Sequence, residues 1–318
     1  MQIHSMPALP SNPHQSGYTI NPFLHHALGI AMFGLPALAL AGKPVNEVRP
    51  LSLQGQVSID NAKGAVLVRV SDKPEARIAG MLGDGVERIA IEGDRNNLRI
   101  RVINPEAMGW FGNWGGGDTR LGITVPSPAS VALESISAAS DVNGVATRRL
   151  RINTVSGQVQ VDASPGEAQI EGVSGDLHLA LQTDKVHAET VSGDLDLHGK
   201  LNGDISVDTV SGKILLRADN PSEVEGSALL GDAELHTGFS RRGQLKAEST
   251  SGDLKLLLPA TSSARLELSR FSGQIQSDTG KVAKPEYGPG SSLDARLCKG
   301  EASISMKSFS GDVSVQLD

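Results

Sequence analysis

Apolar and polar residues alternate strictly along most of the second half of the chain. The alternation is clearest in pairs of apolar residues that enclose one polar residue: Val159 and Val161, Leu177 and Leu179, and Leu195 and Leu197. A period of two is typical of a β-strand with one buried face, whereas an amphipathic helix needs a period near 3.6. The pattern therefore predicts short strands and excludes helices over this region.

A short phrase recurs within this pattern: Val, Thr or Phe, then Ser-Gly, one variable residue, and Val, Leu or Ile. Its seven copies are residues 155–159, 173–177, 191–195, 210–214, 250–254, 271–275 and 309–313. The first four glycines are 18, 18 and 19 residues apart. Fainter copies at the half period, beginning at Gly166 and Gly203, indicate two strands and two turns per repeat.

Strands this short bury little apolar surface alone, but stacked repeats share a continuous core. We therefore predict an all-β, single-stranded β-solenoid similar to a parallel β-helix, with about 18–21 residues per coil. The repeated glycine suits a turn with positive φ. We expect the Val, Thr or Phe before Ser-Gly to fill a corner of the core, and the serines to form a hydroxyl ladder.

The chain divides into three segments on composition. Residues 1–41 lack Lys, Arg, Asp and Glu, and an apolar run ends in Ala39-Leu40-Ala41. This is typical of a Sec-type signal peptide with cleavage near Ala41, the alternative being a membrane anchor. The remaining segments are 42–130, a β-rich start of the solenoid, and 131–318, the regular repeats, with insertions expected near 218–229 and 279–300.

Composition narrows the function classes. The net charge is −7 with no long basic stretch, so nucleic acid is excluded as a partner. Cys298 is the only cysteine, which excludes an intramolecular disulfide and Cys–Cys metal motifs. We expect no cofactor, a periplasmic or secreted location, and no stable membrane span once the leader is removed.

Residues 59–64 and 121–126, together with the Val-Ser-Gly-Asp repeats, resemble a bacterial domain-of-unknown-function family described as "putative adhesin". The resemblance covers roughly residues 50–318. It implies an extracytoplasmic β-solenoid linked to interactions in the cell envelope, and it brings no catalytic residues. An envelope protein or glycan is then the expected partner.

Repeated charged residues are the first candidate for chemistry. Asp176 and Asp194 occupy the same position in adjacent repeats, and His178 and Asp196 also correspond. Such a stack could bind a divalent cation, act as an acid pair on a sugar, or accept hydrogen bonds from turn amides. We adopt the last interpretation and assign no metal ligand and no catalytic residue. The histidines after the leader, His178, His187, His198 and His236, are expected on the surface, although stacking could cluster them.

An aromatic loop is the best binding candidate. Trp110, Phe111 and Trp114 lie between glycines in residues 108–117, where they could stack on a sugar, contact a partner, or cover an end of the solenoid. The sequence thus predicts a non-enzymatic, adhesin-like structural or binding module of the envelope, with a polysaccharide-acting solenoid enzyme as the alternative. Hydrolase, phosphate-loop and dinucleotide motifs are absent from the sequence.

Overall fold

The computed structural model describes residues 42–105, 117–239 and 241–318. These residues form 22 strands and no helix. Consequently, no helix in the described part of the chain could cross a lipid bilayer. The expected signal peptide lies outside the described residues and stays a prediction, as does the division at residue 130.

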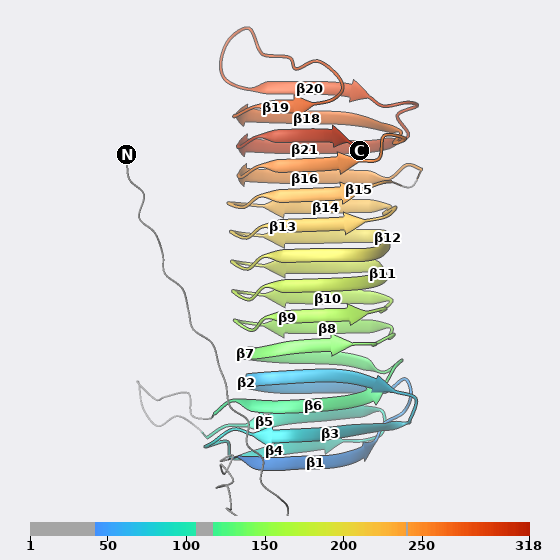
Figure 1. Ribbon diagram of the computed structural model, residues 1–318, viewed down its shortest axis with the longest axis vertical. Coiled ribbons are helices and arrows are strands. Elements are labelled where there is room, and N and C mark those ends of the chain that lie inside the picture. The colour runs from blue at the N-terminus through green and yellow to red at the C-terminus, as the bar shows by residue number, and fades with distance from the viewer. Residues whose placement is uncertain (1–41, 106–116, 240) are drawn as a thin grey trace, which may run out of the picture. The chain divides into compact units, whose positions relative to one another are not determined.

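The strands stack into two faces that enclose the core (Figure 1). In spatial order, the first face contains β4(Arg88–Gly93), β5(Asn97–Ile103), the start of β2(Gln56–Ser71), the start of β7(Ser130–Asn143), β8(Arg149–Thr154), β10(Glu167–Gly172), the ends of β11(Leu177–Thr190) and β12(Leu195–Thr209), β14(Glu223–Ala228), β16(Gln244–Ser251), β21(Ala302–Ser310), β18(Ala264–Ser272) and β20(Ser291–Arg296).

The second face is built in the same way from the other half of each coil. It contains β1(Lys43–Pro50), β3(Glu75–Leu82), β6(Thr119–Pro126), the ends of β2 and β7, β9(Val159–Ala163), the starts of β11 and β12, β13(Ile214–Ala218), β15(Ala233–Thr237), β17(Leu254–Leu258), β22(Val313–Leu317) and β19(Ile275–Ser277). Neighbours are parallel except near the two ends of the stack, where β1–β3, β3–β6, β4–β5 and β18–β20 are antiparallel.

This arrangement confirms the predicted all-β solenoid. Equivalent residues of consecutive coils, such as Val155 and Val173 or Leu229 and Thr250, are 18–21 positions apart. Leu195 and Leu197 point into the core and are buried, whereas Asp196 between them points outward, as the alternation predicts. Apolar side chains from both faces form one continuous buried cluster along the stack.

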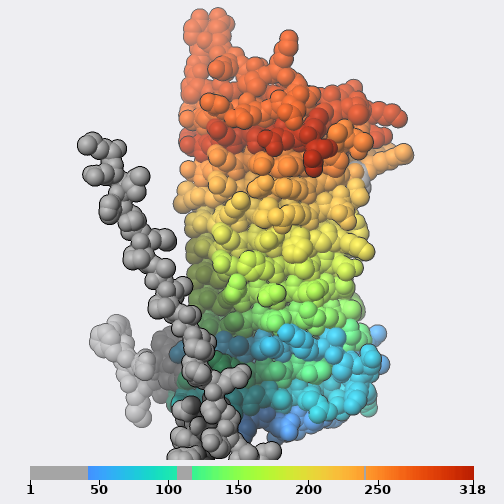
Figure 2. Space-filling model, viewed as in Figure 1, coloured from blue at the N-terminus to red at the C-terminus, as the bar shows by residue number. Residues whose placement is uncertain are grey.

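The sequential order of coils breaks at the C-terminal end. β21 lies between β16 and β18, and β22 lies between β17 and β19, so the last coil in sequence is not the last coil in space (Figure 1). In Figure 2 the dark red C-terminal residues accordingly have orange residues on both sides along the stack. The insertion expected at 218–229 is wrong, because β14 is a regular strand between β12 and β16. The segment expected as a loop at 279–300 contains β20, which closes the first face.

The repeated glycines serve a different purpose from the one expected. At Gly157, Gly175, Gly193 and Gly212 φ is not positive; in this series φ is positive at Gly273 and Gly311, in the last two copies. A Cβ added at Gly175 would instead collide with the backbone carbonyl oxygen of Gly157 in the preceding coil, and the same holds one coil later. Glycine is therefore required by close approach of backbones, not by turn conformation.

Hydroxyl groups hold each corner between the faces. Oγ1 of Thr154 accepts a hydrogen bond from the amide of Gly157 at 3.1 Å, three residues later, and the equivalent threonines of two later coils do the same. The serine hydroxyls of the first four copies form the expected ladder, but each of them donates to a carbonyl of the preceding coil, as Ser174 Oγ donates to Val155 O at 3.2 Å. The corner is thus stabilised both within and between coils.

Candidate functional site

A row of exposed apolar side chains follows one corner of the solenoid. Four of these residues precede Ser-Gly in the repeat, Ile136 and Leu229 take the equivalent position in neighbouring coils, and 38–46% of the surface of each is exposed. The six residues are Ile136, Val155, Val173, Val191, Val210 and Leu229. The expectation that they fill the core is wrong. The residue before each of Val155, Val191 and Val210 is an inward-facing threonine that closes the turn, so the next side chain points to solvent. We call this set the apolar row.

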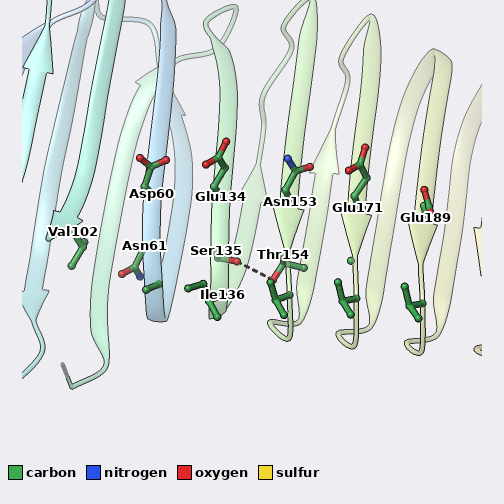
Figure 3. Close-up of a pocket in the computed structure, with 15 residues that line it drawn as sticks. Asp60, Asn61, Val102, Glu134, Ser135, Ile136, Asn153, Thr154, Glu171 and Glu189 are labelled. Carbon is green, nitrogen blue, oxygen red and sulfur yellow. Dashed lines mark hydrogen bonds between the residues drawn. The ribbon is translucent and has the colours of Figure 1, made fainter. Parts of the chain in front are cut away.

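A column of mostly acidic residues runs beside the apolar row on the first face. Strand register aligns its members one per coil: Asp60, Glu134, Asn153, Glu171, Glu189 and Asp208. Figure 3 shows the first five of these side chains projecting in the same direction from neighbouring strands. Neighbours in such a column are about 4.8 Å apart, the ordinary spacing between strands. We call this set the acidic column.

All of the acidic column except Asp208, and all of the apolar row except Val210 and Leu229, line a groove of about 700 Å³ that contains no Lys or Arg among its lining residues. Arg99 contacts Asp60 from a neighbouring strand at 3.0 Å, and Gln169 donates to Glu171 at 2.6 Å. In contrast, Oδ1 of Asp60 and Oδ1 of Asn153 are buried without a hydrogen-bond partner. This acidic groove therefore offers acceptors to a ligand that carries N–H or O–H donors.

A second groove, of about 830 Å³, lies on the same corner toward the β18–β20 end. The positions equivalent to the apolar row are here occupied by Leu229, Thr250, Phe309 and Phe271. The two phenyl rings are stacked, with centroids 4.8 Å apart and planes within 3°. Cationic residues also line this groove, which we call the basic groove: Arg270, Lys284 and Lys307.

Asp176 and Asp194 lie at a different corner position, where their side chains accept hydrogen bonds from backbone amides. Oδ1 of Asp176 accepts the amide of Asp194 at 3.0 Å, and Oδ1 of Asp194 accepts the amide of Lys213 at 2.9 Å. Asp232, Asp253 and Asp312 continue this ladder in later coils. The interpretation as acceptors of turn amides is confirmed, with the detail that each amide belongs to the next coil in the stack.

The histidines are spread over both faces. His187 lies on the first face, whereas His178, His198 and His236 lie on the second. In the described part of the chain, no group of three or more His, Cys, Asp or Glu side chains is arranged to hold a metal ion. His236 instead lies 3.0 Å from Glu234, and Lys255 lies 3.2 Å from the same carboxylate. Hydrogen bonds from His236 and then Lys255 lower the pKa of Glu234 to about 2.

The predicted aromatic site at Trp110, Phe111 and Trp114 lies outside the described residues and stays a prediction. Sequence reasoning missed the apolar row as a surface feature. The row could have been predicted by continuing the alternation one residue past the strand. Ile152 and Thr154 point inward, so Val155 must point outward.

Comparisons with known proteins agree with this fold. Residues 128–244 match the family model Toastrack DUF4097, which confirms the resemblance for that segment. A "putative adhesin" from Parabacteroides merdae is 14% identical, with 86% of this chain and 96% of that chain covered and a TM-score of 0.51. A "putative adhesin" from Parabacteroides distasonis is 13% identical, with 86% and 98% covered and a TM-score of 0.52. No curated protein matches the chain.

Proposed function

We propose that this chain, whose central repeats match the Toastrack model, is a non-enzymatic binding module exported to the bacterial cell envelope. It contacts an envelope protein or glycan along one corner of the solenoid. The observation that carries the proposal is the apolar row, which keeps a large aliphatic side chain exposed in six coils. The two similar solved structures described as adhesins support the proposal by analogy of fold.

The fold itself does not require apolar residues at these positions. Thr250 occupies the equivalent place in β16, and the strand pairs normally with β14 and β21 on either side. The alternation also places this position on the solvent side, where polar residues are ordinary. A contiguous exposed apolar surface on a soluble domain commonly marks an interaction site.

The size of the row suits a partner that lies along the stack. Six coils at about 4.8 Å spacing give a row of about 24 Å. Covering the exposed part of each side chain would contribute about 0.5–1 kcal/mol, because complete burial of such a residue is worth about 1.5–3 kcal/mol. The adjacent acidic column adds acceptors on one side only, which would orient the partner.

The alternative, a polysaccharide-acting enzyme, has less support at its proposed carboxylates. Asp176 and Asp194 each accept a backbone amide of the next coil, which makes them part of the corner. A glycan panel incubated with wild type and with Asp176→Ala and Asp194→Ala tests this alternative directly. Cleavage that either variant abolishes would replace the binding proposal with an enzymatic one.

The decisive binding experiment replaces Val155, Val173 and Val191 together by Ser and measures retention of the purified protein on envelope fractions. We expect retention to fall while the melting temperature holds, because these side chains are outside the core. The matched control replaces Val48, Leu53 and Leu67 by Ser, which are similarly exposed but line neither groove. Equal retention of the two triple variants would refute the proposed site.

A further inference from the structure

We propose that the basic groove binds an acidic polysaccharide through the carboxylate or sulfate groups of its sugars. This inference rests on the proposed function, since it assigns a ligand class to one part of the same corner. The groove differs in charge from the chain as a whole: the chain has a net charge of −7, yet three cations line this groove.

The cations of the basic groove have no acidic partners. Within the described residues, Arg270, Lys284 and Lys307 form no ion pair. Glu248 is the acidic residue that lines the groove, and Lys246 already contacts it at 3.4 Å. Strand register places Glu248 beside Lys307, so the lining carries three cations and one carboxylate, and positive charge is in excess in a concave site, where surrounding protein concentrates its field.

The floor of the groove contains hydrogen-bond donors that have no acceptor. Nε and Nη1 of Arg270 are buried without a hydrogen-bond partner, while Nη2 donates to Ser291 Oγ at 3.3 Å. The hydroxyls of Ser249 and Ser308 are also unpartnered, and these residues are only 8% and 5% exposed. Strand register places Ser249, Ser308 and Arg270 side by side on adjacent strands.

A guanidinium can only donate hydrogen bonds, so its unpaired nitrogens favour a ligand with negative charge or acceptors. Leaving buried donors unpaired is costly in free energy, and such groups commonly mark a place where another molecule supplies the acceptor. Arg270 contributes its charge from the floor, whereas Lys284 and Lys307 are exposed and meet the ligand first. The site therefore selects for an anion.

The remaining lining residues favour a sugar as the molecule that bears the negatively charged group. Hydroxyl side chains dominate the polar lining: Ser227, Ser249, Thr250, Ser269, Ser291, Ser292 and Ser308. A hydroxyl both donates and accepts, which matches the hydroxyl groups of a polysaccharide. The exposed rings of Phe271 and Phe309 supply apolar surface for the C–H face of a sugar. The groove is also continuous along the corner with the apolar row, so a chain-like ligand can extend beyond it.

The test compares two double variants of the full-length protein by isothermal titration at low ionic strength. Lys284→Gln with Lys307→Gln removes two charges from the groove, and Lys281→Gln with Lys299→Gln removes two charges from the same end of the solenoid but outside the groove lining. Probes are polygalacturonate for carboxylates, dextran sulfate for sulfates, and neutral dextran. We expect one or both acidic probes to bind wild type and neutral dextran not to bind.

The groove variant should weaken acidic-probe binding by at least roughly fivefold, the control variant by less than about twofold, and added salt should weaken binding to wild type. Equal losses in both double variants, or no binding of either acidic probe, would overturn the proposal. If sedimentation shows that wild type self-associates and that the groove variant does not, the ligand of the basic groove would instead be the acidic groove of a second copy. Retention of the Val155, Val173 and Val191 triple variant on envelope fractions tests the broader function independently.

Discussion

Replacing Gly175 by Ala provides the sharpest test of how the coils are held together. The added Cβ would collide with the carbonyl oxygen of Gly157, a backbone atom that cannot rotate away. The two coils must therefore separate locally. Four hydrogen bonds join them here. Ser174 N and Ser174 Oγ both donate to Val155 O, at 2.8 and 3.2 Å, Val173 N donates to Thr154 O at 3.2 Å, and Val159 N donates to Asp176 O at 2.9 Å.

Each of these bonds contributes about 1 kcal/mol net, so Gly175→Ala should lower the free energy of unfolding by about 2–4 kcal/mol. A urea titration followed by circular dichroism measures this loss. Gly226→Ala is the matched control, because its Cβ would find only Val207 Cγ2, at 3.7 Å, and its φ is not positive. That variant should be neutral or more stable by about 0.4–1 kcal/mol.

A third variant separates close approach from turn conformation. If Gly175 were required for positive φ, Asn would be tolerated there better than Ala, because Asn enters the left-handed region more readily. Close approach predicts that Asn is at least as damaging as Ala. Equal stability of Gly175→Ala and Gly226→Ala, or a clear rescue by Asn, would refute the reasoning.

Four further predictions follow from the sequence and the fold. Leu195→Asp should cost several kcal/mol in a denaturant titration because it buries a charge, whereas Asp196→Ala should change stability by no more than about 0.5 kcal/mol; equal effects would contradict the register. The pKa of Glu234 is lowered to about 2 in the folded state, from a value near 4.5 in the unfolded chain. The contribution of Glu234 to folding stability is therefore complete above pH 4.5 and is lost as the pH falls toward 2. Glu234→Gln should therefore flatten the acid limb of a stability–pH profile, and an unchanged limb would contradict the assignment. N-terminal sequencing of exported protein should begin near Gly42, and an intact Met1 on such protein would argue against cleavage. Trp110→Ala and Trp114→Ala should reduce envelope binding while the melting temperature holds; the reverse result would assign the loop a capping role.

The regular part of the fold was predictable because its determinants are local. Alternation at Leu195 and Leu197 specifies which side chains enter the core, and the repeat length specifies how coils stack. The role of Gly175 was not predictable in the same way, since the collision that forbids a side chain involves a backbone atom 18 residues away. Spacing alone cannot distinguish that constraint from a turn requirement.

The basic groove was missed for a related reason. Arg270 takes the inward corner position that Ser249 and Ser308 take in neighbouring coils, but the residues that surround it there are distant in sequence. Its neighbours come from β16, β20 and β21, which meet only because β21 enters the stack between β16 and β18. The phrases beginning at Phe271 and Phe309 have the same form, so their order in space does not follow from their order in sequence.

The position of β21 and β22 has a kinetic consequence. A solenoid usually grows by adding each new coil to the last one formed, so folding can follow synthesis from the N-terminus. Here that growth halts at β17, because β18 and β19 pair with β21 and β22 and not with β16 and β17. β18 and β19 are synthesised before β21 and β22 but can join the stack only by pairing with them, so β21 and β22 hold this end of the stack together. Removing residues 302–318 would therefore detach two layers of the stack, not one, and proteins cut short there would expose the edges of β16 and β17 to pairing with other chains.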